Sequence, residues 1–250
     1  MEKMLSIVIA AYNEEKRIPD SLRKIHDFGI ARGLDAEIIV VDDGSTDRTS
    51  EVVRELTPLI QNLKLIRYEK NRGKGYALRT GVLASQGSLV LVSDADLSTP
   101  IEELDVLREH LDDKGCHVAI GSRALALSQL IRKQPWWRRT MGKTFNRFVK
   151  LLIMKDFCDT QCGFKLFHGN VARNLFSRAR IDRFAYDVEI LALAKKSGYR
   201  IAEVPIRWIN APGSKVDPVV DSLQMLKDLL RIRFSLGNVK SYRACSILIR

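Results

Sequence analysis

The feature that most constrains the fold of this 250-residue chain is a series of short, almost purely apolar runs. LSIVIAA at 5–11, EIIVV at 37–41 and SLVLVS at 88–93 lack the alternation of apolar and polar residues that a half-exposed strand shows. Such runs are typical of parallel strands covered by helices on both faces. Between the first two runs, apolar residues recur at helical spacing from Ile18 to Phe28. This alternation predicts an α/β fold with a mostly parallel sheet and right-handed crossovers.

The predicted elements follow one another in a regular order. Strands are expected at Leu5–Ala11, Glu37–Val41, Leu63–Tyr68, Ser88–Ser93, His117–Gly121 and Tyr199–Trp208, with a turn and a short extended piece within Asp159–Phe167. Helices are expected at Glu14–Arg32, Thr49–Leu56, Gly73–Ala84, after Pro100, and at Arg138–Ile153, Ala185–Ser197 and Val219–Phe234. In the last helix an apolar stripe either packs on the sheet, which we favour, or touches lipid; it contains Val219, Leu223, Leu226 and Leu230.

Composition argues against several classes of protein. A hydrophobic content of 46% suits a globular core. No window approaches 18 uninterrupted apolar residues, so no membrane-spanning helix is expected. The first apolar run leads into acidic residues without a small-residue cleavage site, which argues against a signal peptide. The four cysteines form no CxxC pair and suit a reduced, cytoplasmic protein.

Net charge is concentrated in one segment. Residues 114–155 contain ten Lys or Arg and no Asp or Glu, so they carry +10 of the formal net charge of +11. Aromatic residues are interleaved with these charges, at Trp136, Trp137, Phe145 and Phe148. A segment of this kind can contact an anionic substrate, a membrane surface or nucleic acid. The alternative is a merely solvated basic face.

Three of the predicted strands end in clusters of polar side chains, AYNE at 11–14, DDGS at 42–45 and DAD at 94–96. In an open parallel sheet the ligand site lies beyond the carboxyl ends of the strands, so we expect these clusters to line one crevice. Asp42 or Asp43 can accept hydrogen bonds from a ribose or a base edge. A helix N-cap explains a single acid, but it does not explain three converging clusters.

Asp94 and Asp96 stand two residues apart on an extended backbone, so their carboxylates lie on the same side. They would repel each other and raise one pKa unless a cation lies between them. Oxygen ligands of this kind favour Mg²⁺ or Mn²⁺. NRGKG at 71–75 is a weaker candidate for a phosphate-binding loop, because it lacks the Walker spacing.

Six motifs together resemble the inverting glycosyltransferases of family two, and in particular the polyprenyl-phosphate sugar transferases. They are AAYNEE, VVDDGSTDRT, NRGKGYALRTG, SDADLSTP, GSR and DTQCGFKLF, and they run from about Leu5 to Trp208. DTQCGFKLF is similar to the dolichyl-phosphate glucosyltransferases, whereas mannose synthases more often have a Ser-Gly-Phe-Arg variant. The resemblance implies a GT-A fold, with a catalytic domain over 1–210 and a helical, acceptor-side extension over 211–250.

The resemblance also implies roles for individual residues. Donor contacts would come from Ala11, Tyr12, Glu14, Asp42, Asp43, Lys74, Asp94, Ala95 and Asp96. The metal, Mg²⁺ or Mn²⁺, would be held by Asp94 and Asp96, with Ser98 as a third ligand that is left open. The acceptor phosphate would be held by Arg123, Arg138 and Arg139. The residues expected to be catalytic are Asp96, Arg123 and Asp187, with Asp159 as an alternative to Asp187 should a base assist.

The implied reaction is inverting, metal-dependent transfer of a hexose from a nucleotide sugar to dolichyl or polyprenyl phosphate. UDP-glucose is favoured as the donor, and GDP-mannose is the alternative. The protein is expected at the cytoplasmic face of a membrane, bound peripherally by itself or through an anchoring partner, and no nucleic-acid partner is expected. Two other classes are left open, a dehalogenase-like phosphotransferase with Asp94 as nucleophile and a basic membrane- or nucleic-acid-binding protein.

Overall fold

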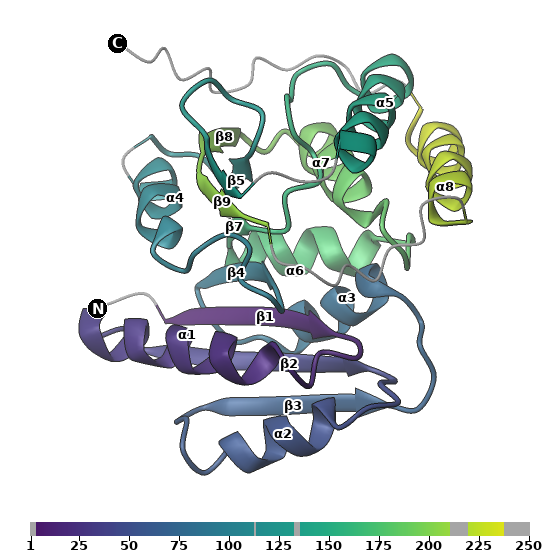
Figure 1. The fold of residues 1–250 in the computed structure, drawn as a ribbon. Coiled ribbons are helices and arrows are strands. Elements are labelled where there is room, and N and C mark those ends of the chain that lie inside the picture. The colour runs from purple at the N-terminus through teal and green to yellow at the C-terminus, as the bar shows by residue number, and fades with distance from the viewer. Residues whose placement is uncertain (1–3, 113, 133–135, 211–219, 238–250) are drawn as a thin grey trace.

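A seven-stranded sheet forms the centre of the fold (Figure 1). The structure is a computed structural model that describes residues 4–112, 114–132, 136–210 and 220–237, without the side chains of 132, 136–139 and 220. The strand order is β3-β2-β1-β4-β7-β5-β8, and β7 is antiparallel to both neighbours while the other pairs are parallel. The strands are β1 (Leu5–Ala11), β2 (Ala36–Asp43), β3 (Leu63–Tyr68), β4 (Leu89–Asp94), β5 (Val118–Ser122), β7 (Lys165–His168) and β8 (Ile201–Pro205).

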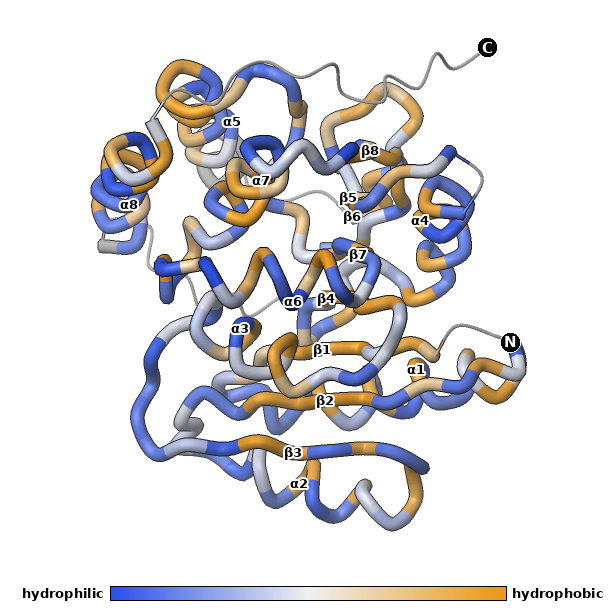
Figure 2. Tube along the Cα trace, turned by 180° about the vertical axis from the view of Figure 1, so that it is seen from behind, coloured by the Kyte–Doolittle hydropathy of each residue, from blue (hydrophilic) through white to orange (hydrophobic). Residues whose placement is uncertain are grey.

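Helices cover both faces of the sheet, as the apolar runs predict. One face packs on α1 (Ile18–Arg32), α2 (Thr49–Leu56) and α4 (Glu103–Asp112). The other packs on α3 (Lys74–Ala84), α6 (Gly169–Arg178) and α7 (Tyr186–Lys196). Helix α8 (Val220–Leu236) lies beside α7, and α5 (Trp136–Leu152) lies beside α8. Because side chains of a strand alternate between faces, Ile7 and Ile9 join one core cluster and Val8 joins the other. Figure 2 shows the resulting hydrophobic runs of β1 and β2 between these layers.

The register of the sheet brings the polar strand ends together. Ala11 pairs with Asp42 on one side of β1, and Ala10 pairs with Asp94 on the other side. The chain runs outward from β1 to β2 and β3, and then returns to place β4 on the opposite side of β1. A ligand crevice in such sheets lies at the point where the order reverses. The expectation that three strand ends meet is therefore confirmed.

The second half of the chain differs from the prediction. The expected strand Tyr199–Trp208 is divided into β8 and β9 (Arg207–Ile209), and β9 pairs with β6 (Gln129–Arg132), where no strand was predicted. The division falls at Ile206, whose N–H donates to the Ser122 carbonyl and whose own carbonyl accepts from the Gln129 N–H. The chain thus leaves the large sheet and enters the small one at Ile206. Helix α6 was not predicted, although its apolar residues have helical spacing.

The last helix packs through a different stripe from the predicted one. Met225, Leu229 and Ile232 of α8 are buried, whereas Leu223 and Leu230 are 60% and 43% exposed. The prediction that Leu223 and Leu230 pack on the sheet is wrong, because α8 lies against α5 and α7 instead. The division at residue 210 stays a prediction, since much of 211–250 lies outside the described residues.

Candidate active site

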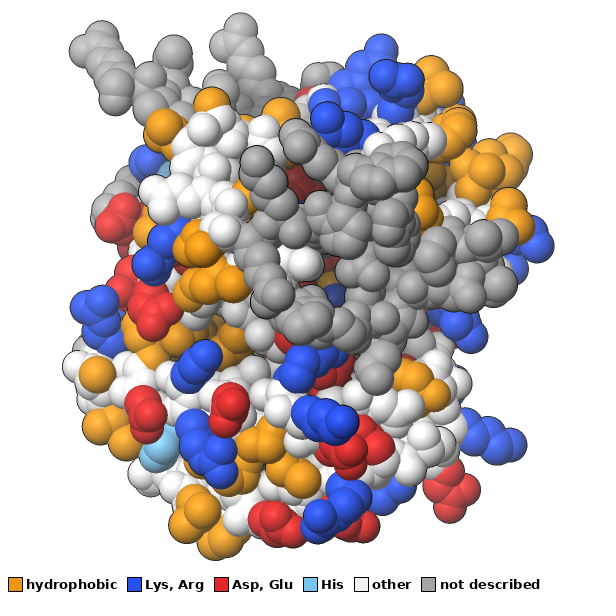
Figure 3. Space-filling view, viewed as in Figure 1, with side chains coloured by type: hydrophobic (Ala, Val, Ile, Leu, Met, Phe, Trp, Pro, Cys, Tyr) orange, Lys and Arg blue, Asp and Glu red, His pale blue; other side chains and the backbone are white. Residues whose placement is uncertain are grey.

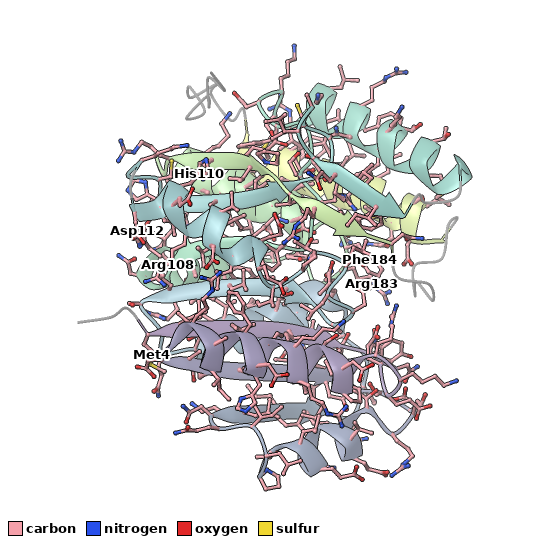
Figure 4. All side chains as sticks on the ribbon, turned by 60° about the vertical axis from the view of Figure 1, so that its left-hand side comes forward. Met4, Arg108, His110, Asp112, Arg183 and Phe184 are labelled. Atoms are coloured by element: carbon pink, nitrogen blue, oxygen red, sulfur yellow. The ribbon has the colours of Figure 1, made fainter. Side chains whose placement is uncertain are left out.

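The candidate site lies at the carboxyl edge of the parallel strands. Figure 4 shows Met4, which precedes β1, on the opposite side of the molecule from Arg183 and Phe184, which precede α7. The loop into α7 packs on the first turn of α3, where a Cβ atom on Gly73 would lie 2.5 Å from the Asp182 carbonyl oxygen. Gly73 also has a φ of 106°, which favours glycine. The start of α3 and the loop into α7 therefore form one wall of the crevice.

The two acids that end β2 are buried and hold loops in place. Asp42 is fully buried, and its carboxylate accepts hydrogen bonds from the Ser45 N–H and the Ser50 hydroxyl. Asp43 accepts from the N–H groups of Arg72 and Gly73, at 2.7 and 2.9 Å. These contacts are structural. A direct contact of either acid with the donor stays a prediction.

Asp43 fixes the NRGKG loop at the entrance to α3. The same loop lines an open recess of about 500 Å³, formed by Tyr68, Glu69, Lys70, Asn71 and Arg72. The Arg72 guanidinium lies 3.6 Å from the centroid of the Tyr76 ring and donates to the Tyr76 hydroxyl at 2.6 Å. The recess therefore offers aromatic, amide and charged groups beside the strand ends.

Asp94 forms an ion pair with Lys74. The Lys74 Nζ atom lies 2.5 Å from Asp94 Oδ1, and the Asp94 side chain is 33% exposed. Burial alone would raise the pKa of the Asp94 carboxyl group, but the nearby cations, Lys74 foremost and then Lys165 and Arg123, together lower this pKa below its usual range. Asp94 is therefore ionised at neutral pH, and the phosphate-loop candidate does reach the acidic cluster.

Asp96 lies beside a cation that the sequence did not single out. Arg17 Nη1 is 3.4 Å from Asp96 Oδ2, and the other side of the guanidinium donates to both oxygens of Glu14. The second oxygen of Asp96 accepts from the Ser98 N–H at 3.0 Å. Glu14 was expected to contact the donor directly, and its observed carboxylate contacts are with Arg17. The donor role of Glu14 stays a prediction.

The donor atoms fit a hard divalent cation. Asp94 ends β4 and Asp96 lies in the turn that follows, so both acids offer carboxylate oxygens at one strand end. Mg²⁺ and Mn²⁺ prefer such ligands. Within the described ranges, no set of three or more His, Cys, Asp or Glu side chains converges on one point. Mg²⁺ is usually held by one or two carboxylates plus waters and substrate phosphates, so two acids suffice. Ser98 is buried, and its role as a third ligand stays a prediction.

The DTQCGFK segment contacts Asp94 through Gly163 and contains Lys165, which forms a buried ion pair with Asp187. Lys165, which begins β7, is 1% exposed and donates to the Cys162 carbonyl oxygen and to the Asp187 carboxylate. Burial raises the pKa of the Asp187 carboxyl group, and the Lys165 ammonium group opposes that rise. Asp187 therefore holds Lys165, and its action as a base stays a prediction.

Arg123 is held in place by Asp159. The guanidinium donates to both carboxylate oxygens, at 2.7 and 2.9 Å, and lies 5.7 Å from the centroid of the Trp208 ring. Burial would raise the pKa of the Asp159 carboxyl group, but Arg123 lowers it to about 2. A carboxylate with so low a pKa is a poor general base at neutral pH, which argues against Asp159 in that role.

The remaining expected residues are placed as follows. Ala11 and Ala95 are buried behind the crevice, and Tyr12 is partly exposed at the end of β1. Arg138 and Arg139 lie in the first turn of α5, but their side chains are outside the described part of the structure. Their role in acceptor binding stays a prediction.

Two residues of the site could have been found in the sequence. Lys165 stands in the apolar segment GFKLF, and a charge in such a segment signals a buried pair. Arg17 follows Glu14 by three residues, which is ion-pair spacing for the start of a helix. Their convergence on Asp94 and Asp96 depends on tertiary packing.

Comparisons with known proteins define the class to which this fold and site belong. Glycosyl transferase family 2 matches residues 6–176. Dolichyl-phosphate beta-glucosyltransferases of Dictyostelium discoideum and Homo sapiens are 39% and 37% identical to this chain, over 92% of it and over 74% and 75% of their own lengths. The enzyme of that name from Saccharomyces cerevisiae is 34% identical over 98% of this chain and 79% of its own.

Solved structures support the same assignment at the level of the fold. Glucosyl-3-phosphoglycerate synthase from Mycobacterium tuberculosis, solved with Mn²⁺, UDP and glucosyl-3-phosphoglycerate, superimposes with a TM-score of 0.68 at 17% identity, over 96% of this chain and 82% of its own. Mannosyl-3-phosphoglycerate synthase from Rubrobacter xylanophilus gives a TM-score of 0.67 at 21% identity, over 94% and 74%. The architecture is thus the GT-A fold of glycosyltransferases. The chain belongs to glycosyl transferase family 2.

Proposed function

We propose that this protein transfers glucose from UDP-glucose to dolichyl or a related polyprenyl phosphate, with inversion, giving a β-linked lipid-phosphate sugar. The names of the relatives support glucose as the sugar and dolichyl phosphate as the acceptor, and the structure solved with UDP supports the nucleotide. The observation in the structure that carries the proposal is the proximity of opposite charges in one crevice. Asp94 and Asp96 can hold a metal, and Lys74, Lys165 and Arg123, in that order, contribute the positive charge that lowers the pKa of Asp94.

Different residues of the site bind the donor and the acceptor. Asp94 and Asp96 would hold the divalent cation, which stabilises the charge that develops on the departing nucleoside diphosphate. Lys74, at the start of α3, adds a positive charge on the donor side. Arg123 binds the acceptor phosphate, and Asp159 and Trp208 fix its direction.

The acceptor needs little help from a base. A phosphate monoester has a second pKa of about 6, so it is mostly ionised at neutral pH. Its oxygen forms the new bond to the anomeric carbon while the bond from that carbon to UDP breaks, and UDP leaves with the electron pair. Attack from the face opposite UDP inverts the configuration. The site then needs to hold two anions next to each other, and positioned cations do so.

Membrane contact is proposed for the α5–α8 side of the molecule, at the cytoplasmic face. Among the helices of the described residues, none combines the length and hydropathy needed to cross a bilayer. Exposed apolar side chains gather instead on the outer faces of α5 and α8, at Phe148, Leu151, Leu223, Leu230 and Phe234. Figure 3 shows hydrophobic side chains gathered at the upper right, over α5 and α8, beside Lys and Arg side chains. Apolar and basic groups together suit a bilayer with anionic headgroups.

One assay tests the proposed reaction. The protein is incubated with Mg²⁺ or Mn²⁺, a short polyprenyl phosphate and a panel of radiolabelled nucleotide sugars, and label is measured in the organic phase. We expect transfer from UDP-glucose that EDTA and Asp96→Asn both abolish. Transfer from GDP-mannose alone would replace the donor assignment, and no transfer from any donor would refute the proposed function.

A further inference from the structure

Arg17 is held in a fixed orientation at the edge of the proposed metal site. Its Nε and Nη2 atoms donate to the two oxygens of Glu14, at 2.6 and 2.5 Å. This two-bond contact uses one side of the planar guanidinium and directs Nη1 toward Asp96. The Arg17 side chain is 24% exposed, so a ligand in the crevice can reach it.

The loop that carries Arg17 and Glu14 is itself built rigidly. The Glu14 N–H donates to the Thr49 hydroxyl at 2.8 Å, and the Glu14 side chain is 9% exposed. Asn13 adopts a φ of 54°, a conformation that costs energy for a residue other than glycine. Its N–H donates to the Ser45 hydroxyl at 2.9 Å, and its side chain accepts from the Thr46 N–H. Neighbouring loops thus hold the Glu14–Arg17 pair in position.

The contact from Arg17 to Asp96 is longer than the contacts within the pair. At 3.4 Å it exceeds the 2.7–2.9 Å that is usual for a charge-assisted hydrogen bond. Asp94, the other acid proposed to hold the metal, is also paired with a cation, Lys74. Two cations beside two carboxylates oppose the binding of a bare divalent ion, unless an anion arrives with it.

The formal charges of five side chains at the site favour an anion with two negative charges. The three carboxylates of Glu14, Asp94 and Asp96 and the two cations Arg17 and Lys74 leave one net negative charge. A divalent ion makes the set positive by one, and the two negative charges of a sugar nucleoside diphosphate return it to one negative charge. A metal and a diphosphate that bind together therefore leave the net charge of this set of five side chains unchanged.

We propose that Arg17 is a donor-binding residue whose Nη1 leaves Asp96 and donates to a diphosphate oxygen when the donor binds, with Glu14 as its positioning residue. The inference rests on the proposed function, since it needs a nucleoside diphosphate donor. It assigns Glu14 an indirect part in donor binding, through Arg17.

Binding measurements test this role without turnover. Three probes are titrated into wild type, Arg17→Gln and Arg17→Lys: UDP with Mn²⁺, uridine, and Mn²⁺ alone observed by electron paramagnetic resonance. We expect Arg17→Gln to weaken UDP binding by about tenfold or more, the usual effect of losing a charge-assisted hydrogen bond. Uridine binding stays the same, and Mn²⁺ alone binds more tightly because Asp96 loses a competing cation. A merely structural residue would not move these affinities in opposite directions.

Arg23→Gln is the matched control. Arg23 pairs with Asp20 at the same three-residue spacing on α1, but both side chains are more than half exposed. All three affinities should match wild type. If circular dichroism shows that Arg17→Gln does not fold, the UDP affinity of Arg17→Lys tests the proposal instead. One nitrogen cannot span Glu14 and a phosphate as the guanidinium does, so UDP should bind about threefold more weakly or worse.

UDP affinity equal to that of wild type in Arg17→Gln, or in Arg17→Lys where it decides, would overturn the inference. A wild-type protein that binds neither UDP nor GDP in the presence of Mn²⁺ would instead refute the proposed function.

Discussion

Gly163 lies directly against the carboxylate of Asp94. A Cβ atom on residue 163 would lie 2.2 Å from Asp94 Oδ2 and 2.3 Å from Oδ1, so a side chain there would have to displace the carboxylate or the loop. Lys165 holds this backbone in place by donating to the carbonyl oxygen of Cys162, the residue before Gly163. The DTQCGFK segment therefore supports Asp94, one of the two acids proposed to hold the metal.

Gly163→Ala should disable the enzyme by displacing Asp94. The added methyl group and the carboxylate cannot occupy the same space, so either the acid or the loop must shift. We expect a loss of about tenfold or more in kcat/KM, with weaker Mn²⁺-dependent UDP binding. Gly29→Ala is the control, because a Cβ there meets nothing within 4 Å and alanine favours the helix. Full activity of Gly163→Ala would show that the Asp94 carboxylate can work from another position.

Arg123→Ala should abolish transfer while leaving UDP binding nearly intact. Its guanidinium stands on the Asp159 side of the crevice, away from the recess beside Asp43. Kinetics and UDP titration, measured side by side, separate the two effects. Arg207→Ala, which removes an arginine paired with Glu103, is the control and should retain transfer. Equal loss of transfer and UDP affinity would place Arg123 on the donor side.

Asp159 should contribute to the acid sensitivity of the fold. Its pKa falls from the usual 3.8 to about 2 in the folded protein, because Arg123 favours the charged form. A lowered pKa stabilises the fold above pH 4, and this stability is lost as the pH falls from about 4 to 2. The shift corresponds to roughly 2 kcal/mol in the free energy of unfolding.

Urea unfolding between pH 7 and pH 3 measures this contribution. The loss of stability on acidification should be smaller in Asp159→Asn than in wild type. Asp20→Asn, at an exposed ion pair, should follow the wild-type curve. Identical pH dependence of wild type and Asp159→Asn would contradict the assignment.

The Lys165–Asp187 pair should be needed for stability. Both side chains are buried, at 1% and 4% exposed, so Asp187→Asn leaves a buried ammonium group without its carboxylate. We expect the free energy of unfolding to fall by about 3 kcal/mol, as for other broken buried pairs. The double variant Lys165→Met, Asp187→Leu should recover part of this loss. A stable Asp187→Asn protein whose kcat loses its pH dependence would favour the base role for Asp187.

The first half of the fold could be predicted from sequence because its signals are local. The runs at β1, β2 and β4 are buried on both faces, and the polar residues after them mark the strand ends. Sheet order then decides which ends meet, and a parallel α/β topology leaves few choices. The crevice of Asp43, Asp94 and Asp96 followed from this rule.

The second half was harder because its elements depend on contacts distant in the sequence. Ile206 changes sheets through hydrogen bonds to residues more than seventy positions away. Arg17 reaches Asp96 across 79 positions, and no local pattern encodes that distance. The buried stripe of α8, with Met225, Leu229 and Ile232, escaped prediction because the helix is apolar on two faces, and only packing shows which face is covered.

The uncovered stripe of α8 leads to the last prediction. Leu223, Leu230 and Phe234 are 60%, 43% and 85% exposed, and Lys227 and Arg231 are exposed on the same helix. Asp228 of α8 is buried and pairs with Arg231, so it contributes little negative charge to this surface. A stripe with these properties should insert its apolar groups at the boundary of a bilayer while the cations meet lipid phosphates.

Sedimentation with vesicles of phosphatidylcholine and phosphatidylserine tests this surface. We expect Leu230→Ser combined with Phe234→Ser to reduce the bound fraction, because each replacement removes apolar area worth about 2 kcal/mol when buried. Salt should weaken wild-type binding, since screening acts on the attraction between the basic residues and the lipid. The control combines Ile30→Ser with Leu59→Ser, two residues that are 68% and 70% exposed on α1 and beyond α2. Equal losses in the two double variants would mean that general surface hydrophobicity, rather than the α8 stripe, brings the enzyme to its acceptor.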